Sequence, residues 1–83
     1  MERLLKALAN RRRLAIVQYV RKNKEASVGE IADAIRISLK ATSKHLSVLA
    51  RADVLEREQR SLQGYYRISS DVPDIVKKIL DAA

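Results

Sequence analysis

Residues 27–49 constrain the fold of this chain more than any other segment, because they hold two helical patterns with almost nothing between them. In the first pattern, Ser27 and Glu30 have the spacing of a capping box, which predicts a helix that begins at residue 28. Apolar residues then recur at helical spacing on its inner face; they are Val28, Ile31, Ala32 and Ile35. Only residues 36–38 separate the two helices, so the helices must cross at a steep angle.

The second helix of this pair is expected to begin after Ser38, a favourable N-cap, and to run to about Arg51. A helical wheel divides it into two faces. The core face is predicted to hold Leu39, Thr42, Leu46, Leu49 and Ala50. The outer face is predicted to hold Lys40, Ala41, Lys44, Val48 and Arg51. No acidic residue occurs from Ala34 to Ala52, so this outer face is cationic and suits the major groove of DNA.

Helical patterns also occur at both ends of the chain. A stripe of Leu4, Leu5 and Leu8 predicts a short helix over residues 2–9. Asn10 is a good N-cap for a second helix, whose inward residues would be Leu14, Val17 and Val20. Asp71 is predicted to cap a last helix over residues 71–83, with Pro73 in its first turn. Its apolar stripe consists of Val72, Ile75, Val76, Ile79 and Leu80.

Between Asp53 and Asp71 the pattern is that of a β-hairpin. Residues 54–60 and 65–69 are the two strands, and residues 61–64 are the turn, in which Gly64 is expected to supply a permissive backbone. We therefore predict a mainly α (α+β) fold with four helices, a hairpin and a fifth helix. This order is a winged helix-turn-helix, a single domain over residues 1–83 with the helix-turn-helix at 28–51 and the wing at 54–69.

The helices at 2–9 and 71–83 carry apolar stripes that extend beyond the core predicted for the other elements. A two-fold dimer would bury these stripes. It would also present two recognition helices, the second helix of the pair in each protomer, about 34 Å apart, which suits a palindromic DNA site. The alternative, which the sequence leaves open, is that both helices fold back on their own monomer. A chain of 83 residues buries only about two-thirds of its unfolded surface, so dimerisation is a common source of added stability.

The amino-acid composition indicates which kind of binding partner is favoured and which kinds of catalytic and metal site are excluded. The net charge of +7 favours a polyanion, and the absence of cysteine excludes disulfides, Cys-based zinc sites and thiol catalysis. No apolar run approaches the ~20 residues of a membrane span, and residues 1–6 lack the apolar core of a secretion signal. The lone His45 has no second metal ligand and no nucleophile beside it. We expect a cytoplasmic protein that is not an enzyme, with no cofactor, no metal site and no membrane partner.

The residues expected to contact DNA lie on the second helix of the pair and on the wing. Lys40, Ala41 and Lys44 are placed to meet base edges, and Ser38 and Ser43 suit a phosphate. His45 lies at the flank, where it contacts phosphate or packs locally. On the wing, Arg60 and Gln63 are favoured over Arg57 and Arg67 for a minor-groove or phosphate contact. For Arg11, Arg12 and Arg13, a phosphate contact and a solvated patch remain equally open.

Several runs of residues resemble the ArsR/SmtB family of bacterial and archaeal winged-helix repressors. They are residues 5–16, residues 30–35, Ser38, the Ser-Lys-His-Leu-Ser-Val-Leu run at 43–49 and the Gly-Tyr-Tyr-Arg-Ile run at 64–68. The resemblance implies a homodimer through the first and last helices and operator binding that blocks transcription. It also implies DNA contacts at Leu39, Lys40, Ser43 and Lys44, with the hairpin as the wing.

The chain departs from this family at four places. Where many members carry metal-binding Cys on the third helix, it has Val28 and Gly29, and the family's Asp-x-His motif reads Asp-Val-Pro at 71–73. We therefore expect no metal sensing through the known sites. In the turn, Arg36 occupies the position where the family usually has glycine. If its backbone is left-handed, this replacement lowers the stability of the fold by about 1 kcal/mol. At the start of the recognition helix, where the family usually has a polar residue, this chain has Leu39. The DNA sequence that it binds should therefore differ from that of its relatives.

The hypothesis from the sequence is a homodimeric, sequence-specific double-stranded DNA-binding transcriptional regulator of the repressor type, bound to a palindromic operator. Two alternatives stay open: a winged helix used as a protein-interaction module, and sequence-independent architectural binding of DNA.

Overall fold

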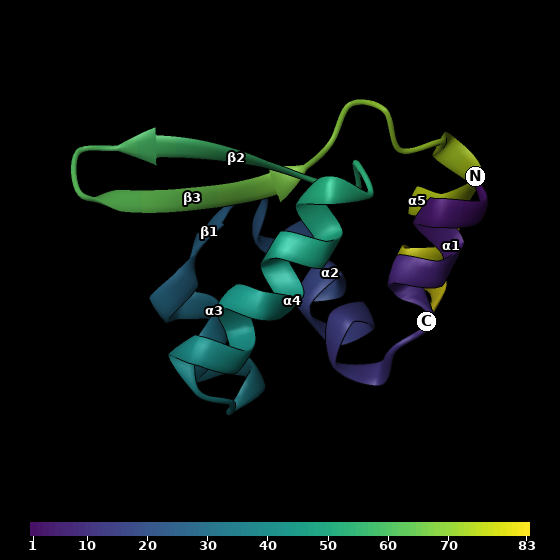
Figure 1. Ribbon diagram of the computed structural model, residues 1–83. Helices are drawn as coiled ribbons and strands as arrows, with labels where there is room; N and C mark the ends of the chain where they lie inside the picture. The colour runs from purple at the N-terminus through teal and green to yellow at the C-terminus, as the bar shows by residue number, and fades with distance from the viewer.

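The computed structural model describes all of residues 1–83, in eight elements. The helices are α1 (Glu2–Leu8), α2 (Arg11–Asn23), α3 (Val28–Ile35), α4 (Leu39–Arg51) and α5 (Asp74–Ala82). The strands are β1 (Ala26–Ser27), β2 (Leu55–Arg60) and β3 (Gln63–Ile68). In Figure 1 the β2–β3 hairpin extends to one side of the helices, and α1 and α5 lie at the opposite end. The predicted order of four helices, a hairpin and a fifth helix is confirmed, and none of the helices has the length and apolar character to cross a membrane.

Three side chains cap helices as the sequence predicts. The side chain of Asn10 accepts hydrogen bonds from the amides of Arg12 and Arg13, each at 3.0 Å. The Ser27 hydroxyl accepts from the amide of Glu30 at 3.2 Å, while the Glu30 carboxylate accepts from the amide of Ser27 at 2.8 Å. Ser38 caps α4 by accepting from the Ala41 amide at 3.0 Å. Because each cap stabilises a helix by about 1 kcal/mol, these contacts fix where α2, α3 and α4 begin.

The turn between α3 and α4 depends on one left-handed residue. Arg36 has φ 63° and ψ 48°, and its amide donates to the carbonyl of Ala32 at 2.8 Å. The amide of Ile37 donates to the same carbonyl at 3.2 Å. This short left-handed turn ends α3 and redirects the chain into α4, as a helix C-cap normally does with glycine.

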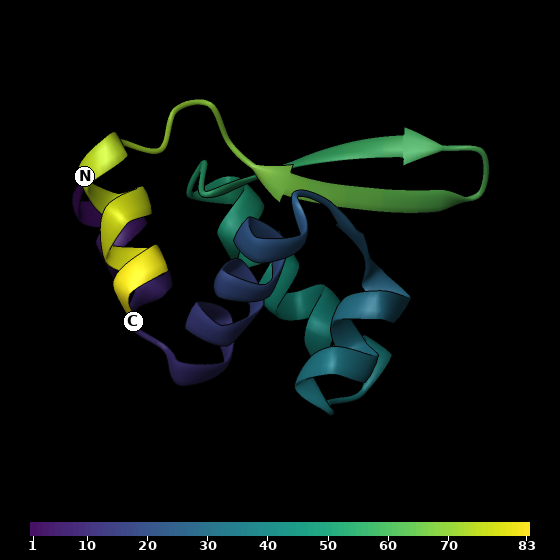
Figure 2. The ribbon, with the colours of Figure 1, turned by 180° about the vertical axis from the view of Figure 1, so that it is seen from behind.

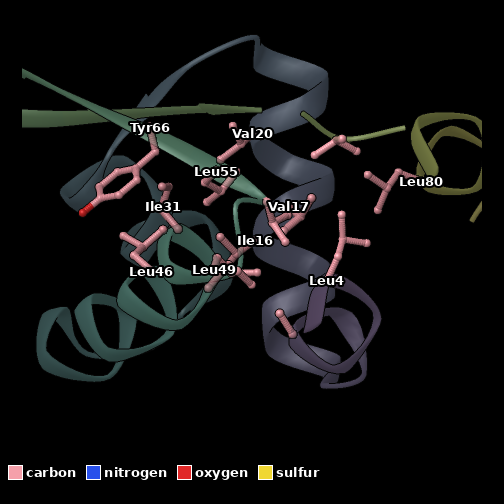
Figure 3. Close-up of a cluster of buried hydrophobic side chains, with 14 of the residues drawn as sticks. Leu4, Ile16, Val17, Val20, Ile31, Leu46, Leu49, Leu55, Tyr66 and Leu80 are labelled. Atoms are coloured by element: carbon pink, nitrogen blue, oxygen red, sulfur yellow. The ribbon is translucent and has the colours of Figure 1, made fainter. Parts of the chain in front are cut away.

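The hydrophobic core surrounds α2, which packs against the other helices and against β3. Figure 3 shows Ile16, Val17 and Val20 of α2 at its centre. The remaining fully buried large side chains come from α3, α4 and the start of the hairpin; they are Ile31, Leu46, Leu49, Thr42 and Val54. Leu39, which was predicted to be part of this core, is instead 60% exposed. Its wheel angle is correct for the core face, but as the first residue of α4 it lies beyond the end of the packed helices.

The sheet contains one strand that the sequence did not predict. Residues Ala26 and Ser27 form β1, which pairs antiparallel with Tyr66 and Tyr65 of β3, and the strand order is β1-β3-β2. Two residues are too few to show an alternating pattern, so β1 has no local signal. Its pairing ties the start of α3 to the hairpin.

The hairpin turn and the start of α5 both differ from the prediction. The turn is the two-residue Ser61–Leu62 connection, and its residue with a positive φ, 56°, is Ser61 and not Gly64, which was expected to supply the permissive backbone of the turn. Gly64 lies inside β3, where a Cβ atom would approach the guanidinium of Arg57 to 2.7 Å. The last helix begins at Asp74, with Pro73 and not Asp71 at the N-cap. The physical reason is that a residue before proline avoids the α conformation, so Val72 cannot be helical, although it is buried in the core.

Candidate nucleic-acid interface

The outward side of α4 is basic and free of internal interactions. Lys40, Ser43 and Lys44 are exposed, and their side chains take part in none of the hydrogen bonds or ion pairs of the chain. Counting 100° per residue, Lys40, Lys44, Ser47 and Arg51 lie within about 60° of one another around the helix. We call these four residues the α4 basic face. Ser47, which is also exposed, was not among the residues predicted from the sequence, although the same wheel places it there.

The first turn of α4 brings several predicted contact residues together. The Ser38 oxygen accepts a hydrogen bond from the Ala41 amide, and its hydroxyl hydrogen remains free to donate to a phosphate. Leu39 is exposed beside Lys40, and Ala41 is half-buried. An exposed apolar side chain next to a lysine offers DNA both a methyl contact for thymine and a donor for guanine.

His45 lies at the flank of α4, half-buried. Burial lowers its pKa below the usual 6.5, and the positive charges of Arg13 and Arg12 lower this pKa further. The imidazole is therefore uncharged at about pH 7. The start of α2 lies beside α4, where Arg13 lines the same hollow as Val48 and Arg51, so Arg12 and Arg13 add to the positive charge on this side of the molecule.

One edge of the wing is neutralised by ion pairs. Arg60 contacts the carboxylate of Glu25 at 2.6 Å and that of Glu58 at 3.1 Å, and its guanidinium carbon lies 4.7 Å from the centre of the Tyr65 ring. Arg67 contacts Glu58 at 2.8 Å and Glu56 at 3.3 Å. The hydrogen bonds from Arg60 lower the pKa of Glu25 and Glu58, and those carboxylates raise the pKa of Arg60. Arg60, the residue favoured for a wing contact, is thus held by the protein itself.

Arg57 is the wing arginine that has no acidic partner. It lies on the opposite face of the hairpin, where its guanidinium packs over Gly64 and donates to the side chain of Gln59. Strand alternation contains the signal for this difference, because it places Glu56, Glu58 and Arg60 on one face and Arg57 on the other. Gln63, also predicted as a contact, is exposed at the start of β3 and pairs with Arg60 across the hairpin.

The views in Figures 1 and 2 place the wing and the pair α1 and α5 at opposite ends of the molecule, with α4 between them. Basic groups without acidic partners also occur on α1, at the end of α2 and on α5, but three sets of them lie on α4, at the start of α2 and on one face of the wing. A continuous polyanion could touch all three.

Comparison with known proteins agrees with this arrangement. Residues 8–58 match the helix-turn-helix domain family. The chain is 39% identical over 67 residues to the transcriptional activator HlyU of Vibrio cholerae, covering 81% of this chain and 61% of that protein. It is 32% identical over 78 residues to the transcriptional repressor PagR of Bacillus anthracis, covering 94% and 78% of the two chains. The chain therefore spans less than two-thirds of the length of HlyU.

Solved structures show the same fold. Reduced HlyU from Vibrio cholerae superposes with a TM-score of 0.83 at 34% identity, covering 96% of this chain and 80% of that one. The homodimeric winged helix-turn-helix DNA-binding domain of Mb0332 from Mycobacterium bovis, described as a possible ArsR-family regulator, gives a TM-score of 0.82 at 31% identity. That match covers 98% of this chain and 71% of the other.

Proposed function

Because this chain belongs to the ArsR-like family of winged helix-turn-helix transcriptional regulators, we propose that it binds duplex DNA as a homodimer and represses transcription from a palindromic operator. In this proposal α4 enters the major groove, and the wing contacts the neighbouring backbone or minor groove.

The observation that carries the proposal is the α4 basic face. Its three cations have no carboxylate partner, and no acidic residue occurs between Ala34 and Ala52. Most basic residues of the chain are likewise unpaired, since only Arg21, Arg60 and Arg67 form ion pairs; what distinguishes α4 is that its cations share one face of a helix without acidic residues. Unpaired cations on one helix face that is fixed by caps at its start are an arrangement suited to phosphates and guanine edges.

The dimer is supported by apolar side chains that the monomer leaves in solvent. Leu4, Val76 and Leu80 of the terminal helices are buried in the monomer core, yet Leu5, Ile75 and Ile79 are 52%, 59% and 58% exposed. These three lie on α1 and α5, at the end of the molecule away from the wing (Figure 2). A second copy joined there would bury the three side chains and leave both wings pointing outward. The two readings that the sequence left open are thus compatible, since one side of each helix packs inward and the other is available.

The experiment is a selection of bound duplex fragments from random or genomic DNA, followed by affinity measurements on the recovered sequence. We expect a palindrome with half-sites about 10 base pairs apart. If the dimer neutralises about 6–10 phosphates, affinity should fall about 10³- to 10⁵-fold between 50 and 200 mM salt. Repression is then tested with a reporter gene placed behind the recovered site.

The test variant is the double substitution Lys40→Gln/Lys44→Gln on α4. Its control is Lys22→Gln/Lys24→Gln, which removes the same charge at the C-terminal end of α2, away from α4. We expect loss of specific binding only in the first. Tight binding without a common sequence would replace the proposal by an architectural role. Absence of binding to any duplex would redirect it to a protein-interaction module.

A further inference from the structure

A cavity of about 500 Å³ lies between α1 and the C-terminal end of α4. Four of its lining side chains are cationic: Arg3 and Lys6 of α1, Arg13 of α2 and Arg51 of α4. Glu2 is the single acidic residue of the lining. The helices α1, α2 and α4 therefore bring a local charge of +3 to one hollow, and none of the four cations takes part in an ion pair.

The cavity is built on a fixed base. The Arg13 Nε donates to the carbonyl of Ala7 at 2.6 Å, which holds that guanidinium in place while its other nitrogens remain free to donate. Ala7 and Ala52 are buried, and Val48 adds a partly exposed apolar side chain. A guanidinium fixed in this way needs little reorganisation to bind an anion, and planar guanidinium groups suit the oxygens of a phosphate.

The position of the cavity relates it to the α4 basic face. Arg51 lies only about 20° around the helix from Lys40 and about 16 Å further along it. The major groove is about 12 Å wide, so a helix that reads bases with its first two turns meets the sugar-phosphate backbone at its far end. Figure 1 shows that this far end of α4 is the end nearest α1.

We propose that this cavity, which we call the α1–α4 cavity, is a phosphate-binding site. Its occupant is a phosphate group, supplied either by the backbone of the bound DNA or by a free phosphorylated compound that would then compete with DNA. The geometry favours the DNA backbone, and that source rests on the proposed function.

The test compares Arg3→Gln/Arg51→Gln with the control Lys22→Gln/Lys24→Gln, which removes the same charge elsewhere. Arg13 is left intact because it supports Ala7. Affinity for the selected duplex is measured between 50 and 200 mM salt. One phosphate lost per protomer should reduce the slope of log K against log salt by about 1.8 for a dimer, so the affinity ratio between these salts falls about tenfold. In the control variant, the slope of log K against log salt should stay close to that of the wild type.

A second arm omits DNA. The wild-type protein is titrated with inorganic pyrophosphate at constant ionic strength, and the arginine Nε resonances are followed by NMR. Two results together would assign the site to a free phosphoryl compound. The wild type would bind pyrophosphate saturably while the double variant does not, and pyrophosphate would weaken the binding of DNA to the wild type. A slope equal to that of wild type and no saturable binding of pyrophosphate would overturn the proposal. If the wild type bound no DNA at all, the proposed function would fail, and the pyrophosphate arm would still test the cavity.

Discussion

Arg36 adopts a backbone conformation that is costly for any residue with a Cβ atom, since its φ is 63°. Its side chain is exposed and forms no ion pair that would offset this cost. We expect Arg36→Gly to raise the free energy of unfolding by up to about 1 kcal/mol, because relief of strain outweighs the entropy that glycine adds to the unfolded chain. Urea denaturation measures the change. Arg36→Ala, which removes the charge but keeps the Cβ, should give little of it; an equal gain in both variants would assign the effect to charge.

His45 links stability to pH. Burial, then the charges of Arg13 and Arg12, lower its pKa in the folded state, so the unfolded chain binds the proton more readily. Stability should therefore fall as the pH drops below about 7, through the unfolded pKa of about 6.5 toward the lower folded value. The carboxylates with lowered pKa, such as Glu58, lose their contribution only below about pH 4.5.

Since His45 is the single histidine of the chain, this window belongs to it alone. We expect His45→Gln to flatten the dependence of the urea midpoint on pH between about 7 and 5.5. A variant that kept the wild-type slope would show that another group titrates there.

Single residues also show where local rules suffice. Asn10, Ser27 and Ser38 cap helices through contacts two or three positions away, so short-range spacing is enough to predict them. The exposure of Leu39 could not be predicted in this way. It depends on how far the packed helices extend along α4, and the wheel contains no information on that distance.

At the scale of elements, the two faces of the wing differ: one carries an arginine that is available to bind DNA, and the other carries arginines in ion pairs with carboxylates of the protein. Arg57 has no acidic partner, whereas Arg60 is shared between Glu25 and Glu58. We expect Arg57→Gln to weaken DNA binding by on the order of 1 kcal/mol and leave the urea midpoint unchanged. Arg60→Gln should do the opposite, with a small loss of stability and nearly unchanged affinity, because its pairs are exposed. Equal losses of affinity in both variants would mean that Arg60 leaves its carboxylates when DNA binds.

Elements also differ in how far the sequence determines them. α3 and α4 follow from period, caps and a three-residue turn, all of which are local. β1 does not, because Ala26 and Ser27 become a strand only by pairing with Tyr66 and Tyr65, about 40 residues away. The start of α5 lies later than predicted, with its N-cap at Pro73 and not Asp71, because Pro73 keeps Val72 out of the α conformation. For the candidate site, the basic side of α4 was predicted, but the cavity was not, since it joins residues of α1, α2 and α4.

At the scale of the whole molecule, the exposed stripe of α1 and α5 predicts the oligomeric state. We expect Ile79→Asp to convert a dimer to a monomer in sedimentation or light-scattering measurements, and to weaken operator binding because the two half-sites are no longer bound together. The monomer fold should survive, since Ile79 is 58% exposed. Leu62→Asp is the control: Leu62 is 94% exposed at the wing tip, so the dimer should persist. A dimer in the Ile79 variant would place the interface elsewhere.

The side chains of Lys40, Ser43 and Lys44 make no contacts that the fold requires, while the caps and the core that hold α4 come from other positions on the same helix. Evolution, or a protein engineer, can therefore exchange these outward residues almost without regard to folding. Under the proposed function the scaffold is in this sense retargetable: duplicated copies of such a gene could diverge toward new binding sequences by a few substitutions that leave the caps and the core of α4 intact.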